Sequence, residues 1–225
     1  TVPTHAVKRV LREHDFSGAI AVVPNAVNIV HFHPGIDGTH VRQKLGVLRG
    51  QKMVLIAGRL SFEKNVDILL KAAAGMKEKP VLVITGEGPA RKPLELQAKK
   101  LGLRDTHFTG FVSENELLHY YAACDVLATA STFETQCLSL IEAMSCGKIC
   151  VGANALAIPE TVSEGENGFL FQAGDAHAAR EALEKALHLP PWKYAQLSKQ
   201  ARATAMHYST EKAVGELLKA YELVL

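Results

Sequence analysis

Short apolar runs alternate with amphipathic segments along most of the 225-residue chain. Seven runs have the length and residue types of strands, and several are unbroken apolar stretches, as in parallel strands that are covered on both faces. They span residues 20–23, 53–57, 81–85, 107–109, 126–129, 149–152 and 168–171. Helical patterns fall between or after them, at 67–76, 89–101, 114–123, 138–146, 176–187, 192–207 and 210–225. This alternation predicts an α/β fold with a doubly wound parallel sheet, closed by terminal helices.

Residues that could bind a ligand or take part in a reaction follow the predicted strands. Gly58-Arg59 follows the second strand, Gly86-Glu87-Gly88 the third, Gly110-Phe111-Val112 the fourth, and a segment that ends at Glu134 the fifth. Ligands of open parallel sheets bind beyond the carboxyl ends of the strands. The pattern therefore predicts a single binding cleft along that edge.

Arg59 and Lys64 are candidates for binding phosphate. Arginine offers a planar fork that suits two phosphate oxygens, whereas lysine offers a compact charge. Both lie on a loop that leads into the helix predicted at 67–76, so they can converge on one diphosphate. The alternative is that both are solvated surface cations, which is the usual environment of these residue types.

Glu134 and Glu142 are separated by seven residues, and the second lies within an apolar helical pattern. A partly buried carboxylate needs hydrogen-bond donors, and the diol of a ribose supplies two. The alternatives for Glu142 are a nearby lysine partner or a place on the helix surface. Glu134 precedes the helix, where it either interacts with the helix dipole or contacts a bound sugar. The first amides of this helix, at Gln136, Cys137 and Leu138, suit a diphosphate.

The Gly86-x-Gly88 turn does not complete a dinucleotide fingerprint. Arg91 occupies the third glycine position, and no strand with a following acid comes at the required distance, so NAD binding is excluded. Pro89 opens the next helix. A tight glycine turn nevertheless allows a base or ribose to approach the backbone.

The composition of the chain argues against several other functions. The net charge is +2 and no run of Lys or Arg exceeds two residues, which argues against nucleic acid as a partner. The four cysteines match no zinc spacing and are expected to be buried free thiols. No carboxylate lies at a metal-ligand spacing from His31, His33 or His40, so no metal site is expected. The opening residues lack the apolar core of a signal peptide, and reduced cysteines indicate the cytoplasm.

The ordered motifs are similar to those of retaining glycosyltransferases of family 4. The chain resembles the carboxyl-terminal, Rossmann-like domain of their GT-B fold, which binds the nucleotide-sugar. The motifs that carry this resemblance cover almost the whole chain: Val23-Pro24-Asn25, Phe32-His33-Pro34, Gly58-Arg59-Leu60 with Lys64, Gly86-Glu87-Gly88-Pro89, Gly110-Phe111-Val112, Glu134-x7-Glu142-Ala143-Met144 and Ile158-Pro159-Glu160.

The resemblance implies a role for each candidate residue. Arg59 and Lys64 would hold the donor diphosphate, and Glu134 would contact the transferred sugar, which makes these three the catalytic residues. Glu142 would bind the ribose, the backbone at Val112 the base, and the turn at Gly86 and Gly88 would line the nucleotide site. Amides of Gln136, Cys137 and Leu138 would meet the sugar or phosphate. The implied donor is a UDP-sugar, with GDP- or ADP-sugars as alternatives, and neither a metal nor a cofactor is implied.

The chain departs from the family pattern at three places. Ala26, Val27 and Asn28 stand where Gly-Val-Asp is common, Leu156 and Ala157 stand where a glycine pair is common, and Cys137 replaces a glycine. A variant donor preference would accommodate these changes.

Family members carry an amino-terminal domain that supplies the acceptor site. We therefore expect residues 1–16 to be a hinge or the end of such a domain, and residues 17–225 to form the nucleotide-sugar-binding domain. The fragment alone is expected to transfer little sugar, to an acceptor that could be a lipid or a glycan, and a lipid acceptor would bring the full-length enzyme to the inner face of a membrane. The alternatives are a phosphorylase or glycan synthase of the same fold, or a nucleotide-binding or interaction module that has lost transfer activity.

Overall fold

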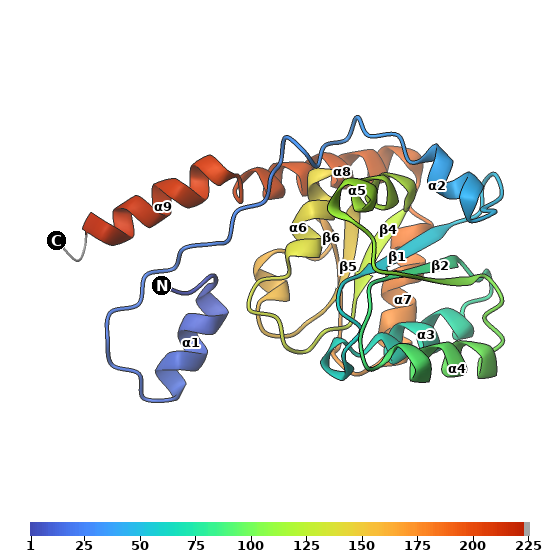
Figure 1. Ribbon diagram of the computed structural model, residues 1–225, viewed down its shortest axis with the longest axis horizontal. Coiled ribbons are helices and arrows are strands. Elements are labelled where there is room, and N and C mark those ends of the chain that lie inside the picture. Colours follow the sequence, from blue (N-terminus) through green and yellow to red (C-terminus); the bar gives the residue numbers. More distant parts are fainter. Residues whose placement is uncertain (223–225) are drawn as a thin grey trace.

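A six-stranded parallel sheet forms the centre of the computed structural model, which describes residues 1–222 (Figure 1). The strand order is β3-β2-β1-β4-β5-β6, and every neighbouring pair is parallel. The strands are β1 (Met53–Ala57), β2 (Val81–Thr85), β3 (Thr106–Gly110), β4 (Val126–Thr129), β5 (Ile149–Ala153) and β6 (Gly168–Phe171). The sheet is thus doubly wound, as predicted, and the order in which strands are added reverses between β1 and β4.

Helices cover both faces of the sheet (Figure 1). One layer contains α3 (Val66–Gly75), α4 (Arg91–Lys100) and α7 (Ala176–Leu187). The other contains α2 (Thr39–Lys44), α5 (Glu114–Ala123), α6 (Leu138–Ser145) and α8 (Pro191–Met206). Every residue of β2 and β5 is buried between these layers, which explains why the strand sequences are unbroken apolar runs.

The strand predicted at 20–23 is wrong. Val22 forms a single parallel bridge with Val2, in which the Val2 amide donates to the Ala21 carbonyl and the Val23 amide donates to the Val2 carbonyl. The segment is extended, as its apolar residues indicate, but the sheet ends at β3 and β6, and these residues lie outside it. Val2, near the start of the chain, supplies the pairing instead, and the apolar pattern did not indicate an extended segment there.

Two helices lie outside the layers, at the same end of the molecule (Figure 1). They are α1 (His5–Glu13) and α9 (Thr210–Glu222), and the last three residues of the helix predicted at 210–225 lie outside the described residues. Residues 26–38 form a long irregular stretch that ends at the short helix α2, which was not predicted.

Candidate functional site

A cavity of about 260 Å³ lies beyond the carboxyl ends of β1 and β4, where the strand order of the sheet reverses. Such a switch point is where open α/β sheets bind ligands. The residues that line it come from the end of β1 and the following loop, the end of β4, and the start of α6. They include six of the predicted site residues: Arg59, Lys64, Glu134, Gln136, Cys137 and Leu138.

Backbone contacts between two loops fix the position of Arg59. The Leu60 amide donates to the Glu87 carbonyl at 2.9 Å, and the Gly86 amide donates to the Gly110 carbonyl at 2.7 Å. A Cβ added to Gly86 would lie 2.0 Å from the Gly58 carbonyl oxygen. The glycine turn is therefore required for this packing, and it supports the loop that carries Arg59.

Gly88 shows the same constraint. Its φ is +159°, and an added Cβ would lie 2.2 Å from the carbonyl oxygen of Leu60. Neither Gly86 nor Gly88 lines the cavity, so both contribute to it through the position of the neighbouring loop.

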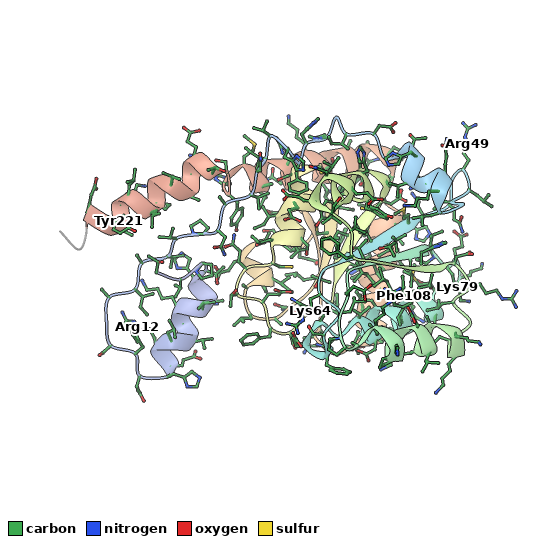
Figure 2. All side chains as sticks on the ribbon, viewed as in Figure 1. Arg12, Arg49, Lys64, Lys79, Phe108 and Tyr221 are labelled. Carbon is green, nitrogen blue, oxygen red and sulfur yellow. The ribbon has the colours of Figure 1, made fainter. Side chains whose placement is uncertain are left out.

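Lys64 and Glu134 form an ion pair at the cavity, with 2.7 Å between Nζ and Oε1. Their side chains are 27% and 12% exposed, so the pair is shielded from much of the solvent. Arg59 is exposed and lines the same cavity. Figure 2 shows Lys64 far along the molecule from Arg49 and Lys79, which lie at the end opposite α9.

The start of α6 adds a further positive group to the cavity. Its N-cap residue is Cys137, whose side chain makes no capping hydrogen bond to the helix. The first amides of a helix and its dipole attract anions. Burial raises the pKa of the Cys137 thiol to about 12, so this residue stays neutral beside them.

Glu142 is bonded to a tyrosine that the sequence did not single out. The buried Tyr121 hydroxyl on α5 donates to Glu142 Oε2 at 2.6 Å. Burial raises the pKa of Glu142, although the bond from Tyr121 opposes that shift. The lysine partner considered for Glu142 is thus replaced by Tyr121 in this structure, and neither Glu142 nor Val112 lines the cavity.

The Gln136 side chain binds the chain segment that precedes the irregular stretch. Its Oε1 accepts from the Asn25 amide at 2.7 Å, and its Nε2 donates to the Asn25 carbonyl at 3.0 Å. Sequence reasoning considered only the backbone amide of Gln136. The two residues are 111 positions apart, and no local signal joins them.

Some classes of site are not found within residues 1–222. No group of three or more His, Cys, Asp or Glu side chains is arranged to hold a metal ion there. The four cysteines are free and buried, as predicted. None of the helices in this part of the chain has the length and apolar character needed to cross a membrane.

The sequence matches one protein family over most of its length. Residues 38–204 match the family described as Glycosyl transferases group 1. Alpha-monoglucosyldiacylglycerol synthase of Streptococcus pneumoniae is 30% identical over 206 residues, which are 88% of this chain and 46% of that protein. D-inositol 3-phosphate glycosyltransferase of Corynebacterium urealyticum is 31% identical over 215 residues, which are 90% of this chain and 50% of that protein. The chain therefore spans about half the length of the curated relatives it matches.

Solved structures share the fold. Anabaena Alr3699/HepE in complex with UDP and glucose has a TM-score of 0.80 at 28% identity, over 90% of this chain and 56% of that one. Sucrose-phosphate synthase of Thermosynechococcus elongatus has a TM-score of 0.89 at 24% identity, over 99% of this chain and 57% of that one. These likenesses agree with the carboxyl-terminal domain of a GT-B fold.

Proposed function

Because the chain belongs to the glycosyl transferases group 1 family, we propose that its cavity binds the diphosphate of a UDP-sugar, the donor for glycosyl transfer. One observation carries this proposal: Arg59, Lys64 and the start of α6 converge on a cavity at the switch point of the sheet. Two side-chain cations and a helix N-terminus together match the charge of a diphosphate.

The pair between Lys64 and Glu134 indicates how the donor would enter. At 2.7 Å the two groups are in direct contact, and we propose that Lys64 exchanges Glu134 for a phosphate oxygen when the donor binds. Glu134 is then free to accept a hydrogen bond from a hydroxyl of the sugar. Binding would thus replace one charge-assisted contact of each residue by another.

In the transfer step, the bond between the anomeric carbon and the diphosphate oxygen breaks. The electron pair remains on the diphosphate, the acceptor hydroxyl forms the new bond to the anomeric carbon, and its proton passes to an oxygen of the departing diphosphate. Arg59, Lys64 and the α6 amides would stabilise the negative charge on the departing UDP, a role that needs no metal. We propose that configuration is retained and that the transferred group is a hexose.

The nucleoside would lie beside the diphosphate. Glu142, on α6, would accept the ribose hydroxyls with the oxygen that Tyr121 does not occupy. The base would contact the backbone at Val112, beyond the carboxyl end of β3. The similar Alr3699/HepE structures contain UDP or UDP-glucose, which supports this choice of donor.

A calorimetric titration of the chain with UDP, GDP and ADP tests the proposal. We expect saturable binding of UDP that exceeds binding of the other two, and competition by inorganic pyrophosphate. We also expect little transfer of sugar by this chain alone, because the acceptor site would belong to a further domain. A chain that is fully folded by circular dichroism but binds none of the three nucleotides would contradict the proposal.

A further inference from the structure

Two loops at the carboxyl edge of the sheet bind the amino-terminal part of the chain. The Thr4 hydroxyl donates to the Thr135 carbonyl at 2.8 Å, in the loop after β4. The Glu160 carboxylate, in the loop after β5, accepts from the amides of His5, at 2.9 Å, and Ala6. The first of these loops also lines the candidate donor cavity, through Glu134 and Gln136.

The contact between the Gln136 side chain and the Asn25 backbone is more specific than these. One buried side-chain amide pairs with both the N–H and the C=O of Asn25, in the manner of a backbone partner in a strand. The same residue lines the cavity, between Glu134 and the first residues of α6. It is therefore the direct link between the segment at Asn25 and the groups that would bind the donor.

We propose that Gln136 is a positioning residue for the donor site: by bonding to the Asn25 backbone, its side chain fixes the turn that presents Glu134 and the α6 amides to the diphosphate. This inference rests on the proposed function. Gln136 contributes no charge to the site, and its side-chain oxygen and one N–H of its side-chain amide bond to Asn25.

The turn has few other fixed points. Thr135 contributes one bond, in which its carbonyl accepts from Thr4. Cys137 contributes two: its carbonyl accepts from the Leu140 amide at 3.2 Å, and its thiol lies 3.4 Å from the Ser139 hydroxyl. Loss of the Gln136 bonds would leave the turn with more conformations, of which only a fraction binds the donor. Apparent affinity falls in proportion to that fraction.

A matched pair of variants tests the role of Gln136. Asn167 is also a buried amide that bridges a backbone pair: it accepts from the Ser163 amide at 2.8 Å and donates to the Thr161 carbonyl at 2.9 Å. It precedes β6 and so lies at the opposite edge of the sheet. Gln136→Met and Asn167→Leu each remove one such bridge while keeping side-chain volume similar.

We expect both variants to lower the melting temperature, because each leaves backbone groups without their partner. Only Gln136→Met should weaken UDP binding, by about tenfold, measured by calorimetry on the 225-residue chain. Equal UDP affinity of Gln136→Met and the unmodified chain would overturn the inference while leaving the proposed function intact. If the unmodified chain does not bind UDP, both are overturned.

Gln136→Glu supplies a second readout that does not depend on the folding of the methionine variant. A protonated carboxyl can donate to the Asn25 carbonyl and accept from its amide, as glutamine does, whereas a carboxylate can only accept. The ratio of its UDP dissociation constant to that of the unmodified chain should fall toward one as the pH approaches about 5. The other titratable groups of the cavity, Arg59, Lys64, Glu134 and Cys137, are common to both proteins and enter the ratio equally. A ratio that does not change with pH would count against the positioning role.

Discussion

Replacement of Lys64 by alanine should separate donor binding from stability. One charge-assisted hydrogen bond to a phosphate is worth about 1.5–3 kcal/mol. Binding also gives up the pair with Glu134, which at these exposures is worth about 1 kcal/mol. The difference, about 0.5–2 kcal/mol, corresponds to UDP binding that is weaker by about two- to thirtyfold in Lys64→Ala.

The same substitution leaves Glu134 without its cation. Glu134 is only 12% exposed, so the unpaired carboxylate should lower the free energy of unfolding by about 1–3 kcal/mol. A second change, Glu134→Gln, removes that unpaired charge. The double variant should therefore recover stability in urea titrations, while its UDP affinity remains low.

Lys71 offers a control for the loss of a paired lysine. It forms a pair with Asp67 at 2.9 Å on α3, with side chains 48% and 38% exposed, and it does not line the cavity. Lys71→Ala should leave UDP affinity unchanged when measured by the same calorimetric titration. If Lys64→Ala binds UDP as tightly as the unmodified chain, the placement of the diphosphate beside Lys64 is refuted.

Four further substitutions, one of them a control, test the loop packing, the ribose contact and the bound helix. Gly86→Ala should cost several kcal/mol in urea titrations and weaken UDP binding, because its Cβ would meet the Gly58 carbonyl. Gly165→Ala, at a φ of +72° with open space around it, should cost only about 1–2 kcal/mol. Burial raises the pKa of Glu142, so its ionised form opposes folding above that pKa. Glu142→Gln should therefore raise the melting temperature at pH 7, by an amount that shrinks as the pH falls through the raised pKa, and should weaken UDP binding. Glu160→Ala should cost about 0.5–2 kcal/mol of local stability in α1, seen as faster amide hydrogen exchange there.

The sheet could be predicted from the sequence because its strands are continuous apolar runs. All six strands of the sheet were predicted to within one residue at each end, and the cavity residues Arg59, Lys64 and Glu134 were found because they follow such strands. The apolar run at 20–23 misled the prediction, since an extended segment can pair with any free backbone, and here it pairs with Val2.

The contacts that hold the site together could not be predicted in the same way. Tyr121 and Glu142 come from different helices, and Gln136 and Asn25 are 111 residues apart, so neither pair leaves a periodic signal. The turn at Gly86 was predicted, but its reason was not, because the carbonyl that excludes a side chain there belongs to another loop. In each case the missing information is a long-range contact that only the folded chain creates.

The packing of the two glycines against the neighbouring loop also limits how this protein can evolve. Any change in the first or second base of a glycine codon introduces a side chain, and at Gly86 and Gly88 the atoms in its way are backbone carbonyls. A clash with a side chain can be relieved by a second mutation to a smaller residue, whereas a backbone oxygen is present whatever residue occupies that position. At these two sites, therefore, no second mutation can make room for a side chain, as it can at most buried positions. In a library of random variants they should stay glycine while the residues around them change.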